Sequence, residues 1–284
     1  MHLTVPLALV GALTVACSRA YLFDVPLGED NSESGDTPPE DSNADAMVGF
    51  RCGPEPYAHV TLKVVSTSNT PLAGIQFRSD QCSDVTAVSD KDGLISGYVT
   101  KETPFVGRLE GKLYVPILTP EESFKADEIT VSVPMFPTLL LSLLPDYKAT
   151  AGALLVQLAH VDTATSPCAA QDGVSLSLKE QPDAKIVYYT SDVIPQPNGK
   201  TYTGDSGFAS VTNLTPDGFV TPRGKKKNCL VSFKSSMNTG RAPLEAGWLT
   251  VIQGVVFNDP DAGALPLDAE PMDAGSLDGT VPKG

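Results

Sequence analysis

The sequence predicts an all-β protein made of two tandem antiparallel β-sandwiches between acidic ends. Short runs alternate between apolar and polar residues, as half-buried strands do: Val60–Val64, Ile129–Val133 and Val174–Leu178. Turn-forming segments such as Asp90–Gly93 and Pro216–Gly218 separate these runs. Helical periodicity does not alternate with the strands, which argues against a parallel sheet covered by helices.

The first residues are typical of an export signal. Leu3 to Ala16 carries no charged residue and ends directly before Cys17. This stretch is shorter than the ~20 residues of a membrane-spanning helix but suits the apolar region of a signal peptide. Small residues before a cysteine resemble the lipobox of bacterial lipoproteins. The resemblance implies a signal peptide over 1–16, a lipid on Cys17 and, because Ser18 follows, the outer membrane. A plain cleaved signal is the alternative.

Acidic segments flank the predicted sandwiches. The net charge of the 284 residues is −14, of which residues 24–46 contribute −8 and residues 257–284 contribute −5, leaving −1 for the rest. We expect both segments to be disordered, because the first has hardly an apolar residue and the second repeats short Asp-Ala units. The lipidated tether, 17–49, would hold the folded part ~30 Å from the membrane. The charge excludes a general affinity for nucleic acid, which needs clustered Lys and Arg.

A weak internal repeat divides the middle of the chain. Each copy reads as a strand, a glycine turn into a second strand, and a Ser/Thr-Asp-Gly turn into a third strand. The segments are Val60–Val64, Pro71–Ile75 and Ser89–Gly93 in the first copy and Leu154–Leu158, Ala170–Val174 and Thr203–Gly207 in the second. The repeat predicts one sandwich over 50–146 and another over 147–256, followed by the acidic tail, 257–284.

At these residues the chain resembles the carboxypeptidase regulatory-like family. The motifs are "PLAGI" (71–75) and "SDKDG" (89–93), with looser copies "AQDGV" (170–174) and "TGDSG" (203–207). The resemblance covers roughly 50–134 and 150–256 and implies transthyretin-like or immunoglobulin-like sandwiches. It also implies a spacer or binding role in an exported protein without a catalytic residue, and some relatives bind starch-like carbohydrates.

One apolar run does not alternate. Met135 to Leu144 is bounded by Pro134 and Pro145 and is too short to cross a membrane. A buried strand and a single helical turn between the domains both fit this pattern.

The motif Gly204–Gly207, "GDSG", resembles the nucleophile loop of chymotrypsin-like proteases, and His59 lies upstream of it. That family continues with a second Gly and a Pro, whereas Phe208 begins an expected strand here. Several barrel strands hold a triad histidine in that fold, but His59 follows only the tether. We therefore expect a hairpin turn at Ser206 and predict that the chain is not an enzyme.

The two histidines of the mature chain fit ordinary surface positions. His59 shares the polar side of its strand with Thr61 and Lys63, which predicts a solvated side chain. His160 lies at a strand end, as a rim histidine does. Because no cysteine is spaced with them as zinc ligands are, we predict no metal and no cofactor.

Other residues offer candidate contact surfaces. The basic run Arg223–Lys227 suits an exposed hairpin, with anionic headgroups or acidic polysaccharide as alternative contacts. Trp248 is expected to anchor the core. Tyr188, Tyr189 and Tyr202 flank the inserted loop and are the candidates for a sugar-stacking surface, although packing at a strand edge is the favoured interpretation.

The four cysteines left after lipidation of Cys17 are even in number, and export permits disulfides. Of the three pairings, only Cys52–Cys82 with Cys168–Cys229 stays within the repeats, and we predict it. The sequence as a whole favours a non-catalytic, envelope-anchored binding or spacer protein. Its partners would be the membrane, through the lipid, and a protein or polysaccharide of the envelope; a carbohydrate-binding lipoprotein is the alternative, and a hydrolase the weaker one.

Overall fold

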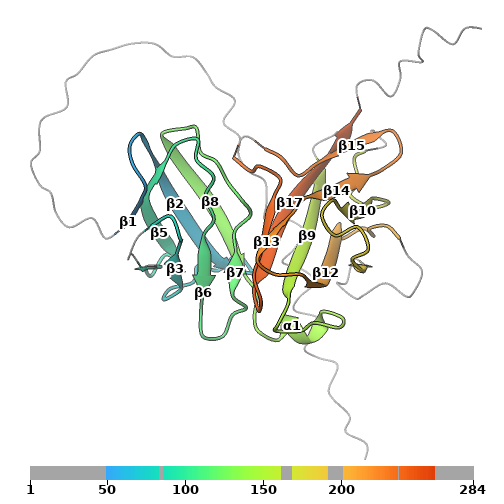
Figure 1. The fold of residues 1–284 in the computed structure, drawn as a ribbon, viewed down its shortest axis with the longest axis horizontal. Helices are drawn as coiled ribbons and strands as arrows, with labels where there is room; N and C mark the ends of the chain where they lie inside the picture. The colour runs from blue at the N-terminus through green and yellow to red at the C-terminus, as the bar shows by residue number, and fades with distance from the viewer. Residues whose placement is uncertain (1–48, 83–85, 161–167, 191–200, 236, 260–284) are drawn as a thin grey trace, which may run out of the picture.

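The computed structural model describes residues 49–82, 86–160, 168–190, 201–235 and 237–259. The predicted signal peptide, the lipidation site Cys17, nearly all of the tether and the acidic tail after Asp259 lie outside these ranges. The described chain consists of strands and one short helix, which confirms the all-β prediction (Figure 1).

The first half of the chain contains β1 (Phe50–Cys52), β2 (Tyr57–Ser66), β3 (Gln76–Arg78), β4 (Ala87–Val88), β5 (Leu94–Thr100), β6 (Arg108–Glu110), β7 (Ile117–Leu118), β8 (Glu128–Met135) and α1 (Leu140–Leu143). The second half contains β9 (Gly152–His160), β10 (Ser175–Leu178), β11 (Ile186–Tyr188), β12 (Phe208–Leu214), β13 (Gly218–Val220), β14 (Pro222–Lys225), β15 (Cys229–Ser232), β16 (Ala242–Leu244) and β17 (Leu249–Asn258).

The first half is a sandwich of two sheet layers. A four-stranded sheet in the order β1-β5-β2-β8 packs against strands β7, β6, β3 and β4 of the large sheet. The predicted alternation of β2 is confirmed, because its even-numbered residues from Ala58 to Val64 are fully buried. The rings of Phe50 and Phe77 join the two layers with centroids 4.5 Å apart.

The second half repeats the strand order of the first. Its central strands run β12-β9-β17, where the first half has β5-β2-β8. In both halves the last strand lies parallel to the long strand in the centre of the sheet, so β8 pairs with β2 and β17 pairs with β9 in parallel. The crossover through the opposite layer makes these pairs parallel within otherwise mostly antiparallel sheets. The small sheets β10-β14 and β13-β16 supply the other residues of the second core.

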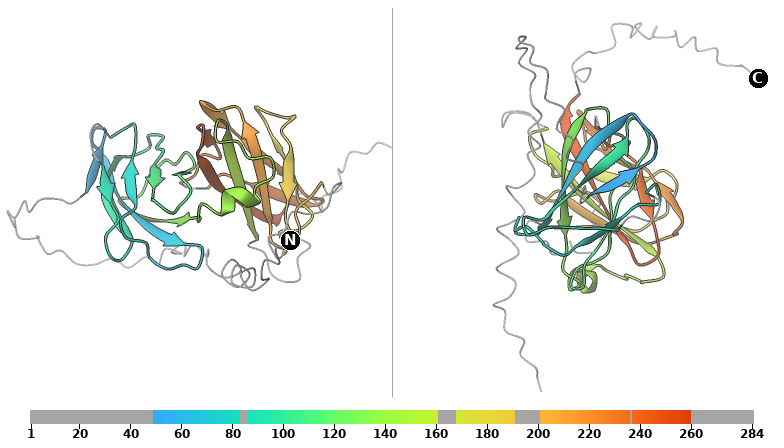
Figure 2. Two further views of the ribbon diagram at one scale, coloured as in Figure 1. Left: turned by 90° about the horizontal axis from the view of Figure 1, so that it is seen from below. Right: turned by 90° about the vertical axis from the view of Figure 1, so that its left-hand side faces the viewer.

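One sheet connects the two halves. Strand β17 pairs in parallel with β7 through Leu249 and Thr250, as well as with β9. Figure 1 and Figure 2 show β7 and β17 side by side between the two groups of strands. Side chains of β9 alternate between the cores: Leu155 packs in the first, and Leu154 and Val156 pack in the second. Strand β9 is thus buried on both faces, which accounts for its continuous apolar run.

The turns of the repeat have the same backbone structure in both halves. Gly74 and Gly173 have φ of 78° and 68°, a region that glycine adopts without a steric penalty. The N–H groups of these two glycines donate to the carbonyl oxygens of Ser89 and Thr203, at 2.9 and 2.8 Å. The repeat seen in the sequence is therefore a repeat of structure.

Both predicted disulfides are present. Cys52 is bonded to Cys82 and Cys168 to Cys229, each within one half of the chain. In the apolar run from Met135 to Leu144, only Met135 belongs to β8, whereas Leu140–Leu143 form the single turn α1. Of the two alternatives, the helical turn is therefore the one that the structure shows.

Candidate functional site

The outward face of the four-stranded sheet carries the candidate site. Because side chains alternate along a strand, Tyr57, His59, Thr61 and Lys63 lie on the outward face of β2. The structure places His59 on the polar side, as the sequence predicts. Its ring is half-buried rather than fully solvated, because the ring of Tyr98 lies beside it with centroids 5.1 Å apart.

Strand register assembles one row of side chains across this sheet. Arg51 of β1 is paired with Tyr98 of β5, Tyr98 with His59 of β2, and His59 with Glu128 of β8. The row therefore presents a guanidinium, a phenol, an imidazole and a carboxylate in sequence across the four strands. Residues 47 positions apart in the chain become neighbours only through the parallel pairing of β1 with β5.

Tyr98 is the centre of an aromatic cluster. The ring of Tyr57 meets it edge-on at 6.0 Å between centroids. The guanidinium carbon of Arg51 lies over both rings, 5.1 Å from the centroid of Tyr57 and 5.7 Å from that of Tyr98. Stacking of this kind holds the exposed Arg51 side chain flat against the sheet without neutralising its charge.

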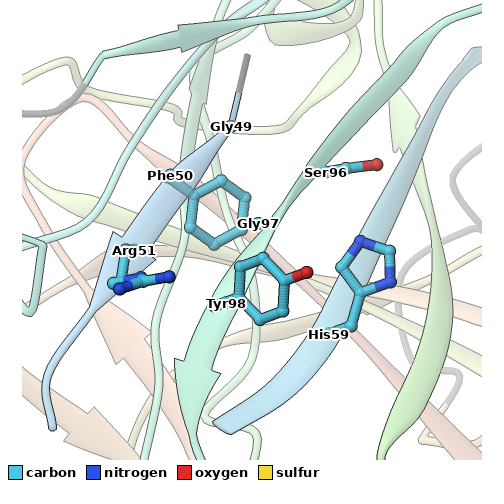
Figure 3. A pocket seen from close by; sticks show the side chains of 7 residues that line it. All are labelled: Gly49, Phe50, Arg51, His59, Ser96, Gly97 and Tyr98. Atoms are coloured by element: carbon cyan, nitrogen blue, oxygen red, sulfur yellow. The ribbon is translucent and has the colours of Figure 1, made fainter. Parts of the chain in front are cut away.

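A shallow pocket of about 400 Å³ lies over this cluster (Figure 3). Its lining consists of Gly49, Phe50, Arg51, His59, Ser96, Gly97 and Tyr98. The Ser96 hydroxyl, 3.3 Å from that of Thr61, adds polar groups next to the aromatic rings. Among the described residues, neither the Arg51 guanidinium nor the Tyr98 hydroxyl has an ion-pair or hydrogen-bond partner, so both can bind a ligand.

Two features hold β1 in place beside β5. Gly97 lies under Phe50, and a Cβ atom at Gly97 would come within 2.5 Å of the Phe50 ring, so only glycine allows β1 this close. The disulfide from Cys52 to Cys82 fixes the other end of β1, one residue beyond Arg51. The close packing at Gly97 and the disulfide therefore both hold Arg51, the middle residue of β1, beside Tyr98.

The tyrosines singled out in the sequence have other roles. Tyr188 and Tyr189 are 5% and 3% exposed, so the packing interpretation holds for them and they form no stacking surface. The Tyr188 hydroxyl accepts a hydrogen bond from the N–H of Leu176, and that of Tyr189 lies 2.7 Å from the Ser210 hydroxyl. Burial raises the pKa of both phenols. Tyr202 is 42% exposed.

Trp248 is half-buried and not a full core residue. The guanidinium carbon of Arg78 lies 5.8 Å from the centre of its ring, so the tryptophan packs at the junction of the two halves. The side chain of His160 lies outside the described residues.

Ser206 occupies a turn. Its hydroxyl donates to the carbonyl oxygen of Tyr189 at 3.1 Å and accepts from the N–H of Phe208 at 3.3 Å. Gly207 has a φ of 66° and leads directly into β12, as the hairpin interpretation predicts. The structure places His59 on β2 in the other half, and it does not bring His59 and Ser206 together.

Within the described ranges, no three His, Cys, Asp or Glu side chains are grouped as metal ligands are. No helix in the same ranges is long and apolar enough to span a membrane.

No family model and no curated protein matches the chain. Solved structures with some similarity include a minor pilin of Streptococcus agalactiae, at 11% identity over 72% of this chain and 97% of that one, with a TM-score of 0.25. A streptococcal ancillary pilin is 14% identical over 72% of this chain and 63% of its own, with a TM-score of 0.23. The shaft pilin of Lactobacillus rhamnosus GG is 10% identical over 70% of this chain and 98% of its own, with a TM-score of 0.23. Similarities this low carry no argument about function, and the sandwich architecture rests on the strand pairings above.

Proposed function

We propose that this protein is a non-catalytic binding module of the bacterial envelope, held to the membrane by a lipid on Cys17, and that it binds carbohydrate on the Arg51–Tyr98–His59 face. The observation that carries the proposal is the row itself, in which half-buried aromatic rings lie beside the Arg51 guanidinium and the hydroxyls of Tyr98 and Ser96. Such a combination suits a ligand with one apolar face and many polar groups at its edge.

A pyranose ring has that character. Its C–H groups pack on the face of an aromatic ring, while its hydroxyls point outward in the ring plane. Over Tyr98, those hydroxyls would reach the Arg51 guanidinium on one side and the hydroxyls of Ser96 and Thr61 on the other. This places the carbohydrate-binding alternative on the first half, in a different location from the tyrosines that the sequence suggested.

The position of the tether agrees with a surface role. The described chain begins at Gly49, at the rim of the pocket, so the segment that leads from Cys17 enters the fold beside the site. A disordered tether of about 30 residues, as the sequence predicts, would have a reach of ~30 Å, enough for the face to turn toward a polymer near the membrane.

Binding to a glycan array, followed by calorimetry on any glycan that binds, tests the proposed ligand. Tyr98→Ala should weaken binding by about tenfold, the effect of losing ~1.4 kcal/mol of contact energy from an aromatic residue at the centre of the binding surface. Tyr202→Ala, an exposed tyrosine of the second half, is the matched control and should leave affinity unchanged. A glycan that binds both variants equally, or an array without any binder, contradicts the carbohydrate proposal.

The lipid anchor has a separate test. Intact-mass analysis of the membrane-extracted protein should show loss of residues 1–16 and an added diacylglycerol, and Cys17→Ala should release the protein from membranes. A soluble mature form that begins at another residue contradicts the anchor without affecting the binding face.

A spacer role is the second candidate, and the shared sheet favours it. Pairing of β17 with both β7 and β9 gives the two halves a common hydrogen-bonded layer, which suits a rigid body. Residual dipolar couplings should fit one alignment tensor for both halves. Two independent tensors would show that the halves reorient and would contradict a rigid spacer.

A further inference from the structure

A row of exposed cations lies on the second half, away from the candidate site. Strands β10 and β14 pair in antiparallel register, with Ser177 opposite Arg223 and Ser175 opposite Lys225. These positions point outward, and the strands end at further exposed cations. We call Lys179, Arg223, Lys225 and Lys227 the basic strip.

The basic strip is not neutralised by the described part of the fold. None of its four cations is within ion-pair distance of a described carboxylate, whereas the neighbouring Lys226 is largely buried and contacts Asp172. Glu180 interacts electrostatically with Lys179, although the two are not within ion-pair distance, and its carboxylate accepts hydrogen bonds from the N–H and hydroxyl of Thr221. Because these cations have no ion pair with the described residues, an anionic ligand would be attracted to them. The chain itself, with a net charge of −14, has acidic segments that could supply one.

The acidic tail begins next to the basic strip. Asn258, the last residue of β17, is paired with Cys229, at the hairpin that carries Lys227. Asp259 follows directly, and five more acidic residues lie within twenty positions of Asn258: Asp261, Asp268, Glu270, Asp273 and Asp278. Lys226 is bridged to Cys229, so Arg223 lies only three residues, ~10 Å, further along β14. Ten residues of fully extended chain from Asn258 to Asp268 would span up to ~35 Å, which is more than this distance.

We propose that the acidic tail binds the basic strip of its own chain and shields it from other polyanions. Individual exposed ion pairs are weak. A short connection of this kind nevertheless keeps the tail carboxylates at an effective concentration in the millimolar range, so several weak pairs suffice for occupancy. The N-terminal tether has more acidic residues, but it enters the fold at β1, at the opposite end of the body from β10 and β14 (Figure 1, Figure 2).

Two full-length variants with the same change in charge test the proposal. The tail variant carries Asp261→Asn, Asp268→Asn, Glu270→Gln, Asp273→Asn and Asp278→Asn. The tether variant carries Glu29→Gln, Asp30→Asn, Glu33→Gln, Asp36→Asn and Glu40→Gln. In amide NMR spectra at low salt, the tail variant should differ from the native chain at residues 175–179 and 221–227, and the tether variant should not. At about 1 M NaCl, where the Debye length is ~3 Å, that difference should vanish.

Binding of fluorescent dextran sulfate provides the second measurement. The tail variant should bind this polyanion roughly tenfold more tightly than the tether variant at low salt, because only the former exposes the basic strip. Adding Arg223→Gln and Lys225→Gln to the tail variant should remove the gain. Equal affinities of the two variants, or amide shifts at the basic strip that the tether variant matches, overturn the proposal.

Discussion

Ser89 and Thr203 make the same pair of hydrogen bonds in the two halves of the chain. The Ser89 hydroxyl accepts from the N–H of Ile75 at 2.9 Å and donates to the carbonyl of Leu72 at 2.7 Å. Thr203 accepts from the N–H of Val174 at 3.0 Å and donates to the carbonyl of Gln171 at 2.7 Å. Both side chains are buried, so each hydroxyl satisfies backbone groups that water does not reach.

Removal of this hydroxyl should destabilise the second half. Thr203→Val keeps the shape of the side chain but leaves a buried N–H and a buried carbonyl without their partner, at a cost of about 1–3 kcal/mol. Thr203→Ser keeps the hydroxyl and is the matched control, with a smaller loss. Urea unfolding of both variants measures the difference, and equal free energies of unfolding would show that the hydrogen bonds contribute nothing.

Glu122 should make the stability of the protein fall as pH rises. Its carboxyl is buried at the junction of the halves, bridged through its backbone to Phe105 and Asn238, and burial raises its pKa from 4.5 to about 8. Within the described structure, its Oε2 atom has no hydrogen-bond partner.

In the unfolded chain Glu122 ionises near pH 4.5, whereas in the folded chain it stays protonated up to about pH 8. The contribution of protonated Glu122 to the free energy of unfolding is therefore fully present below pH 4.5. It is lost as the pH rises from 4.5 to about 8, at up to about 1.4 kcal/mol per pH unit. Glu122→Gln should flatten the profile of unfolding free energy over this range, and Glu102→Gln, at an exposed position, should not. Parallel profiles for the native chain and Glu122→Gln would refute this assignment.

An ion pair across the junction should couple the two halves. Glu121 accepts hydrogen bonds from the Arg241 guanidinium at 2.9 and 3.1 Å, and its side chain is 7% exposed. Arg241→Ala would leave the carboxylate buried with Thr239 as its remaining side-chain donor, at a cost of about 1–3 kcal/mol. A double-mutant cycle with Glu121→Gln should give a coupling energy above about 0.5 kcal/mol, and additive losses would argue against coupling.

Gly97→Ala should damage both stability and the candidate site. The added methyl group would overlap the Phe50 ring and backbone, and overpacking of this kind costs about 1–3 kcal/mol. Displacement of β1 would also move Arg51 away from Tyr98. Gly218→Ala is the control, since open space surrounds that position. Unfolding and glycan binding measure the two effects; unchanged values for Gly97→Ala would rule out the close approach of β1.

The sequence by itself determined the strand class, the repeat and the disulfides. Alternation along Val60–Val64 identified the buried face of β2, because the strand period of two depends only on local backbone geometry. Turn chemistry is equally local, so the glycine turns at Gly74 and Gly173 could be matched before any contact was known. The pairing of Cys52 with Cys82 followed from the repeat, since a bridge within one half needs no knowledge of how the halves meet.

Only the tertiary structure decided which surfaces meet and which remain open. The row of Arg51, Tyr98 and His59 depends on the parallel register of β1 with β5, and register is a relation between strands that no single strand encodes. Tyr188 and Tyr189 flank a loop in the sequence, yet Tyr188 is buried in the second core and Tyr189 in the first. The sharing of β9 between two cores also arises from long-range pairing with β17, because burial of a strand's second face requires a layer supplied by distant residues.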